Sequence, residues 1–350
     1  MDERMPLRVG VNFGACDWGR DGATLLEVAH AADRLGLHSV WTAEAYGYDA
    51  VTPLAWIGAT TRRVRLGTAV LQVPARTPAM AGMTAATLDA MSGGRLLLGL
   101  GPSGPQVVEG WHGLPFVDPL GWTREYVEVV RRVVRGERLR FDGAHFTIPS
   151  RHEQATGLGK ELRLAVDPRP PIPVYIAANG PRNLSLAGEI ADGCLPALLS
   201  PYRFAEVQWP SIEAGLAKAA APKAEGRFDV AASIPVLVGE DVDELFDRLR
   251  PGVAFQLGRM GAKGRNFYND IACRYGYEKE ATRIQDLCLE GRFADAVPEV
   301  PDALLDEIAL VGPKARIRDR LEPWRQCGIT TLLVTTPEPA SLQTLSELLD

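Results

Sequence analysis

The chain has 350 residues, of which 46% are hydrophobic and 23% are charged, and its formal net charge is −6. Enough apolar side chains are present for a large buried core, which excludes a disordered chain, and the negative balance argues against nucleic acid as the main partner. No apolar run approaches the roughly 18 residues of a membrane span, and no signal-peptide pattern is present, so we expect a cytoplasmic protein with no membrane partner.

The chain contains five cysteines, Cys16, Cys194, Cys273, Cys288 and Cys327. Their number is odd and none lies in a CxxC spacing, so we expect reduced thiols rather than disulfides or a zinc site. The sequence also has no HExxH motif or clustered carboxylates, and we therefore expect no catalytic metal.

Strand-like segments alternate with amphipathic helical patterns along the chain. After the first such segment, Leu25, Val28, Ala32 and Leu35 recur at the spacing of one helix face. A later helical pattern at 78–91 can begin with Thr77 as its cap. The eight strand-like segments are 7–13, 38–44, 64–72, 95–101, 173–178, 192–198, 229–238 and 329–336.

Two segments interrupt this alternation. One is a loop rich in Pro and Gly at about 141–173, and the other, at about 250–314, has helical patterns but no recognisable strand. Eight strands followed by helices predict an α/β protein with one domain over 1–350: a (β/α)8 TIM barrel carrying a long loop insertion and an inserted helical region before the last strand.

Active sites in such barrels lie at the carboxyl ends of the strands. The segment GLGPSG at 99–104 follows the fourth strand and satisfies the GxGxxG pattern of dinucleotide-binding proteins. Pro102 and Pro105 interrupt the turn and the start of any phosphate-binding helix, so we favour a glycine loop that lets a planar ligand approach the backbone. An ordinary glycine-rich turn is the alternative.

A second glycine loop follows the fifth strand, where Gly180 and Pro181 lead into a helix. Backbone N–H groups at the start of a helix favour a phosphate group, and Arg182 would add a charge-assisted hydrogen bond. The alternative is that Pro181 only begins the helix and Arg182 is solvated.

Several longer blocks together resemble a known family. They are SVWTAEAYG, RLGTAVLQVPARTPAMAG, LDAMSGGRLLLGLGPSGPQVVEGWHG, PLGWTREYVEVVRRV and PVYIAANGPRNLSLAGEIADGCLP. The pattern spans nearly the whole chain and resembles the luciferase-like monooxygenase superfamily. Within it, the chain resembles the actinobacterial oxidoreductases that use coenzyme F420, an 8-hydroxy-5-deazaflavin. The resemblance implies a (β/α)8 barrel, a homodimer and a deazaflavin or flavin cofactor.

The resemblance also implies where the cofactor binds. Family members commonly hold it over a bulge after the third strand that contains a non-prolyl cis peptide, and the matching bond here joins Ala69 to Val70. Cys194 belongs to the implied set, although a buried cysteine is more often a packed thiol than a reactive one. The implied cofactor-binding residues are Ala69, Val70, Gln72, Ser103, Gly104, Gln106, Val107, Ala177, Ala178, Asn179, Gly180, Pro181, Arg182 and Cys194.

Relatives often carry an acidic residue followed by histidine at the end of the second strand, whereas this chain has Glu44 followed by Ala45. The missing histidine puts a borrowed proton-transfer scheme in doubt. We interpret Glu44 as a catalytic or cofactor-orienting residue. A structural role, in which it only accepts hydrogen bonds, is the alternative. Tyr46 and His112 are the other candidates for proton transfer.

These features predict an F420-dependent oxidoreductase that transfers a hydride between C5 of the deazaflavin and an electron-poor carbon of a small organic substrate. Two alternatives stay open. The same barrel could bind FMN and act as a luciferase-like monooxygenase, or it could bind a flavin without catalysing a reaction.

Overall fold

A computed structural model describes residues 6–14, 16–221 and 228–349 of the chain. Its main sheet is parallel and closes on itself, because β3 pairs with β2 on one side and with β5 on the other. The barrel has the eight predicted strand positions, each here called a stave and numbered in chain order. The third stave is divided by a break between β3 and β4. The strands are β1 (Arg8–Asn12), β2 (Ser39–Thr42), β3 (Arg65–Thr68), β4 (Leu71–Gln72), β5 (Leu96–Gly101), β8 (Val174–Ala177), β9 (Gly193–Leu195), β10 (Asp229–Ile234) and β13 (Thr331–Val334).

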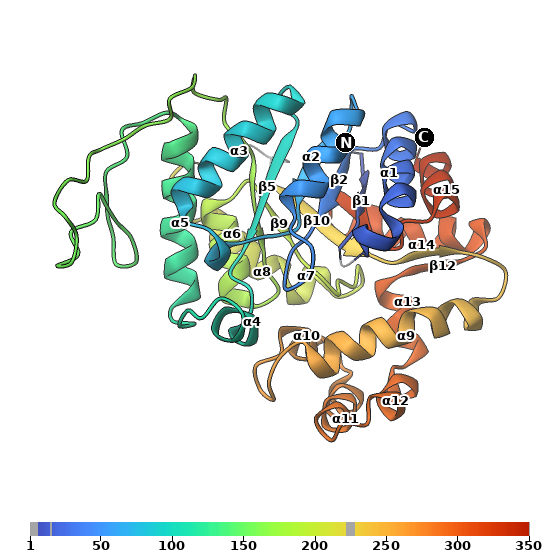
Figure 1. Ribbon diagram of the computed structural model, residues 1–350. Coiled ribbons are helices and arrows are strands. Elements are labelled where there is room, and N and C mark those ends of the chain that lie inside the picture. The colour runs from blue at the N-terminus through green and yellow to red at the C-terminus, as the bar shows by residue number, and fades with distance from the viewer. Residues whose placement is uncertain (1–5, 15, 222–227, 350) are drawn as a thin grey trace.

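Helices follow the strands and cover the outside of the barrel (Figure 1). As predicted, Thr77 caps α3 by accepting a hydrogen bond from Met80 N at 3.3 Å. The helix α5 (Pro119–Val134) begins directly after Asp118, whose side chain caps its first turn by accepting a hydrogen bond from Gly121 N at 3.2 Å. The helices are α1 (Trp18–Arg34), α2 (Val51–Thr60), α3 (Pro78–Ser92), α4 (Pro105–Gly110), α5 (Pro119–Val134), α6 (Pro181–Ile190), α7 (Phe204–Val207), α8 (Trp209–Leu216), α14 (Lys314–Gln326) and α15 (Pro339–Leu349), with the 3-10 turn η1 (Val73–Ala75).

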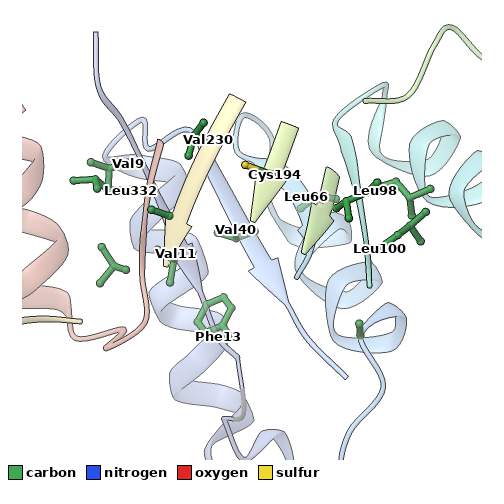
Figure 2. Close-up of a cluster of buried hydrophobic side chains, with 14 of the residues drawn as sticks. Val9, Val11, Phe13, Val40, Leu66, Leu98, Leu100, Cys194, Val230 and Leu332 are labelled. Atoms are coloured by element: carbon green, nitrogen blue, oxygen red, sulfur yellow. The ribbon is translucent and has the colours of Figure 1, made fainter. Parts of the chain in front are cut away.

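Alternate residues of each strand face opposite sides of the barrel wall. Side chains such as Val11, Val40 and Cys194 face outward and form the core between strands and helices (Figure 2). Trp41 and Tyr175 face inward, where their rings meet edge to face with centroids 5.3 Å apart. Large side chains therefore fill the part of the barrel interior that lies below the carboxyl ends of the strands.

The long loop insertion contains a short hairpin of β6 (Phe141–Asp142) and β7 (Thr147–Ile148) and then runs without helix or strand to β8. In Figure 1 it forms the green excursion beside α5.

The segment expected to be helical without a strand differs from that expectation in two respects. The first helix, α9, begins at Val242, so the expected boundary at residue 250 falls inside it. A strand, β12 (Leu310–Gly312), pairs in parallel with β11 (Val236–Val238); its three residues are too short to give a period-2 signal. The elements here are α9 (Val242–Arg259), α10 (Phe267–Arg274), α11 (Glu278–Leu289), α12 (Phe293–Ala296), η2 (Val297–Glu299) and α13 (Asp302–Ile308).

The inserted helices lie on the side of the barrel where the strands have their carboxyl ends. In Figure 1, α9 to α12 and α4, which follows the carboxyl end of β5, lie toward the same side. The loop after β9 is joined to them, because the backbone N–H of Ser200 donates to the Tyr275 hydroxyl at 3.2 Å and the Ser200 hydroxyl donates to Glu307 at 2.8 Å. The insertion therefore borders the end of the barrel where ligands bind in this fold.

None of the helices in the described part of the chain is long and apolar enough to span a membrane.

Candidate active site at the barrel mouth

The carboxyl end of the barrel, here called the mouth, is lined by small side chains. Ala69, Val70 and Ala177 pack against the upper side of the interior core and keep part of their surface exposed. A Cβ atom on Gly101 would lie 2.6 Å from Cγ2 of Val70 and 3.5 Å from Cβ of Ala177, so these residues of three staves meet. Small, partly exposed side chains therefore lie at the mouth, next to the large buried rings of Trp41 and Tyr175 in the interior.

The third stave is interrupted at the mouth by residues 69–72, here called the shelf segment. The peptide bond between Ala69 and Val70 is cis, as the family resemblance predicts. Leu71 faces the outer core together with its register partner Leu100, so Gln72 and its partner Gly101 face the interior. Val70 therefore stays partly exposed at the mouth, whereas Gln72 is buried and its side-chain amide donates to Ala45 O at 2.8 Å.

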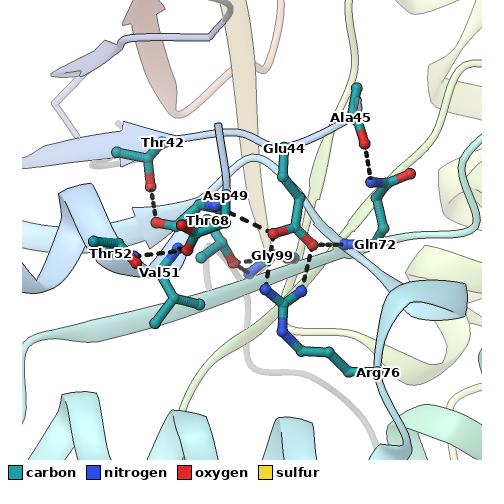
Figure 3. A network of polar contacts seen from close by, with 11 residues as sticks. Thr42, Glu44, Ala45, Asp49, Val51, Thr52, Thr68, Gln72, Arg76 and Gly99 are labelled. Carbon is teal, nitrogen blue, oxygen red and sulfur yellow. Dashed lines mark hydrogen bonds and ion pairs between the residues drawn. The ribbon is translucent and has the colours of Figure 1, made fainter. Parts of the chain in front are cut away.

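Glu44 lies two residues beyond β2 and directs its carboxylate toward Gln72 and Arg76 (Figure 3). Arg76 binds it with both ends of its guanidinium, at 2.5 Å from Nη1 to Oε1 and 3.0 Å from Nη2 to Oε2. Backbone N–H groups of Gln72 (2.9 Å to Oε1) and Ala50 (3.1 Å to Oε2) also donate to it. Four donors therefore satisfy a carboxylate that is only 6% exposed. These contacts favour the structural role that the sequence left open for Glu44.

Arg76 is a site residue that the sequence analysis missed. Burial alone would lower the pKa of its guanidinium, but the hydrogen bonds and charge of Glu44 raise the pKa above the ordinary arginine value. Burial also raises the pKa of Tyr126, whose hydroxyl finds no hydrogen-bond partner among the described residues, although the charge of Arg76 acts in the opposite direction. Only its position soon after a strand end could have drawn attention to Arg76.

The loop after β5 brings the second group of implied residues to the mouth. Ser103 has a φ of +62°, which is uncommon for a residue other than glycine and is typical of functional loops. Gly104 is the N-cap of α4, whose first turn contains Gln106 and Val107. Ser103, Gly104 and Val107 are half-buried and Gln106 is exposed, so all four remain partly accessible.

The fifth strand ends in the third group. The side-chain oxygen of Asn179 accepts a hydrogen bond from Ala197 N at 2.9 Å, which links the ends of β8 and β9. Gly180 is the N-cap of α6, and Pro181 and Arg182 begin that helix with exposed side chains. The backbone amides at this helix start are therefore available to an anion, and Arg182 is placed to add its charge.

Some implied residues do not join these groups through their side chains. Cys194 and Ala178 are buried in the outer core, so a ligand in the mouth could meet only their backbone (Figure 2 shows Cys194). Tyr46 is 59% exposed in the loop after β2. His112 lies just beyond α4, half-buried, and its Nε2 atom finds no partner among the described residues.

These residues fit a flat ring with an anionic tail. Gly180 has a φ of −78°, which any residue can adopt, yet no described heavy atom lies within 4 Å of the place where a Cβ would project. Glycine there keeps space open at the start of α6. Oε1 of Gln72 in the shelf segment and Oδ1 of Asn183 in α6 are buried polar atoms without a partner in the described chain. Among all residues that the structure describes, no cluster of histidine, cysteine or acidic side chains could hold a metal ion.

Comparison with known proteins identifies the fold family. The family model for luciferase-like monooxygenases matches residues 11–331. The chain belongs to this family. A similar protein from Mycobacterium tuberculosis is 40% identical to this chain over 345 residues, which are 98% of this chain and 99% of that protein. Its assignment as a coenzyme F420-dependent oxidoreductase is itself provisional.

Solved structures show the same architecture for this luciferase-like chain. The coenzyme F420-dependent tetrahydromethanopterin reductase of Methanopyrus kandleri superposes with a TM-score of 0.81 at 23% identity, covering 98% of both chains. An F420-dependent secondary alcohol dehydrogenase, in complex with an F420–acetone adduct, gives a TM-score of 0.76 at 20% identity and also covers 98% of both chains. These likenesses confirm the predicted TIM barrel.

Proposed function

We propose that this luciferase-like protein is a coenzyme F420-dependent oxidoreductase. It would transfer a hydride between C5 of the deazaflavin and an electron-poor carbon of a small organic substrate. The observation that carries the proposal is the mouth itself, where the shelf segment, the loop at Ser103 and Gly104 and the open start of α6 lie at the carboxyl ends of the neighbouring strands β4, β5 and β8. The choice of deazaflavin rather than FMN is supported by the F420-dependent proteins to which the chain is similar.

When bound, a 5-deazaflavin supplies two-electron hydride chemistry at C5. The protein would place the ring and hold its tail. Val70 and Ala177 offer an apolar surface for one face of the ring, and Ser103 and Gly104 border it from the next stave. The amides at the start of α6, with Arg182, would bind the phosphate.

Proton transfer to the substrate needs a group that can reach it. Glu44 already accepts four hydrogen bonds, which leaves neither oxygen free for this work. Of the two other proposed donors, His112 has an unpartnered ring nitrogen among the described residues, whereas Tyr46 is largely exposed. We therefore propose His112, or solvent admitted at the mouth, as the source of the proton.

We also propose that the chain forms a homodimer through α2 and α3, which contact each other. The 25 residues of these helices include one charged side chain, Asp89, and it is buried against Arg169. Trp56, Met80 and Met83 are about half exposed on them. An uncharged outer surface of this kind is typical of a protein interface. Sedimentation velocity should show a dimer, and Met83→Glu should shift it toward monomer.

Titration of the purified apoprotein with F420 and with FMN, followed by fluorescence quenching in both redox states, tests the proposed function. Selective micromolar or tighter binding of F420 is expected. Selective binding of FMN would overturn the choice of cofactor, and binding of neither would overturn the enzyme assignment. Oxygen consumption gives a second readout, because hydride transfer to or from a deazaflavin consumes none.

The partner is a small molecule in this proposal, and the location is the cytoplasm. The five cysteines form no disulfide with one another, which suits a reducing compartment.

A further inference from the structure

The shelf segment is held from two sides: Leu71 and Gln72 pair in parallel with β5, and the end of the second stave holds the other side. The amide of Ala69 donates to Thr42 O at 2.7 Å, and the carbonyl of Val70 accepts from Glu44 N at 3.3 Å. The amide of Gln72 donates to the Glu44 carboxylate at 2.9 Å, and its side chain donates to Ala45 O at 2.8 Å. On the side away from β5, the position of the shelf segment therefore depends on where Glu44 and its neighbours lie.

Arg76 fixes Glu44 in turn. Its two guanidinium nitrogens meet the two carboxylate oxygens, and a fork of this kind sets the plane of the carboxylate as well as its position. The carboxylate also accepts from Ala50 N, at the start of α2, so the pair joins three segments: the end of the second stave, the shelf segment and α2. The arrangement is visible in Figure 3.

We infer that Arg76 and Glu44 are a pair of positioning residues that sets the height and orientation of the shelf segment beneath the ligand. Glu44 does this as an acceptor of four hydrogen bonds and takes no part in proton transfer. The test of this inference by F420 affinity rests on the proposed function. The test by the mobility of the shelf segment does not.

The physical reason is geometric. A ring lying on Val70 would be displaced if the shelf segment moved, and misplacement by about 1 Å can cost on the order of a hundredfold in rate. Removing the carboxylate charge would free the Arg76 guanidinium and leave the amide of Gln72 without a strong acceptor. Removing the guanidinium would leave the carboxylate buried with two donors instead of four.

The chain offers a matched control pair. Asp89 and Arg169 form an ion pair at 2.9 Å whose side chains are 6% and 27% exposed, against 6% and 20% for Glu44 and Arg76. Asp89 also accepts from Leu96 N at the amino end of β5, so this pair lies at the end of the barrel away from the mouth. Asp89→Asn therefore reports the general cost of losing such a pair.

The experiment compares Glu44→Gln, Arg76→Met, the double variant and Asp89→Asn. We expect each single change at the mouth to weaken F420 binding about tenfold, with the double variant no weaker than either, because both changes break one unit. Asp89→Asn should lower thermal stability by a similar amount but leave the F420 dissociation constant unchanged. Additive losses in the double variant, or an equal loss of affinity in Asp89→Asn, would contradict the inference.

Two further readouts separate positioning from catalysis. The pH profile of the residual activity should keep its shape in Glu44→Gln; loss of a limb would make Glu44 a proton-transfer residue. Arg76→Lys keeps the charge but can supply only one of the two contacts, so its affinity should lie between those of wild type and Arg76→Met.

Hydrogen exchange of the apoprotein tests the inference without any cofactor. Peptides that include residues 69–72 should exchange faster in Glu44→Gln and Arg76→Met than in wild type and Asp89→Asn. Unchanged exchange would overturn the positioning role. If wild type failed to bind F420 while this exchange difference held, the proposed function would fall and the positioning role would stand.

Discussion

The two ends of the barrel interior contain opposite kinds of residues. At the amino end, Asp229 on β10 accepts from the Tyr175 hydroxyl at 2.8 Å and from the Thr331 hydroxyl at 2.9 Å, and it pairs with Arg8 at 2.8 Å. Its side chain is 7% exposed. At the carboxyl end, Ala69, Ala177 and their neighbours are small and make few polar contacts inside the barrel.

This difference separates stability from function along one axis. The polar network at the amino end joins the starts of β1, β8, β10 and β13 and closes the interior. At the mouth, Ala69 and Ala177 stay partly exposed, and the polar pair of Glu44 and Arg76 joins the end of the second stave to the segment before α3. Barrels of this type carry activity at the carboxyl end, so changes at the two ends should have distinct effects.

The largest effect is expected at Asp229. Asp229→Ala would remove the acceptor of the Tyr175 and Thr331 hydroxyls and the partner of the partly exposed Arg8 guanidinium. Hydrogen bonds to a charged group contribute about 1.5–3 kcal/mol each, so we expect a loss of about 3–5 kcal/mol. Urea denaturation should show this loss in the free energy of unfolding, while F420 affinity at a temperature where the variant is folded should be unchanged. A selective loss of affinity would break the division between the two ends.

The second largest effect is expected when the pH is lowered, and it should again arise at the amino end of the barrel, at His38. Burial, together with the charge of Arg8, lowers the pKa of His38 from 6.5 to about 4. The unfolded chain therefore takes up a proton that the folded chain refuses, and stability should fall as the pH falls from about 6.5 to 4, by at most about 3 kcal/mol. Over this pH range, the free energy of unfolding measured by denaturation should fall less steeply with falling pH in His38→Asn than in wild type. An equal dependence on pH in the two proteins would contradict the assignment to His38.

Gly180→Val should affect the mouth alone. A side chain there would project into space free of described atoms, so the free energy of unfolding should change by less than about 1 kcal/mol. The same side chain would occupy the proposed phosphate position, and F420 affinity should fall about tenfold. Gly252→Val, at an equally open glycine of α9, is the matched control and should leave affinity unchanged.

The smallest effect is expected for Tyr46→Phe. Because the ring is 59% exposed, solvent can replace its hydroxyl, and kcat should change by less than about threefold. A loss of about a hundredfold would instead make Tyr46 the proton donor.

Local sequence patterns were sufficient for the barrel and for the positions of its mouth loops. A strand such as Leu96–Gly101 carries its own signal, because its buried leucines and flanking turns lie within a few residues of one another. The start of α3 is equally local, since Thr77 and Pro78 adjoin it. The family resemblance added the cis bond at Ala69, which no periodicity could indicate.

The orientation of a residue within the wall is harder to assign. Cys194 is adjacent to mouth residues in sequence, yet the two-residue repeat of a strand turns its side chain outward, and the strand contributes only three residues to reveal that repeat. The short strand at Leu310–Gly312 escaped detection for the same reason.

The sequence by itself determined the fold class, the strand order along the chain and the loops that reach the mouth, because each depends on residues close together in the chain. Only the tertiary structure decided which distant side chains meet. Arg76 reaches Glu44 across 32 positions and Asp229 reaches Tyr175 across 54. Such pairs form because closure of the barrel brings separate staves side by side, and no local pattern carries that information.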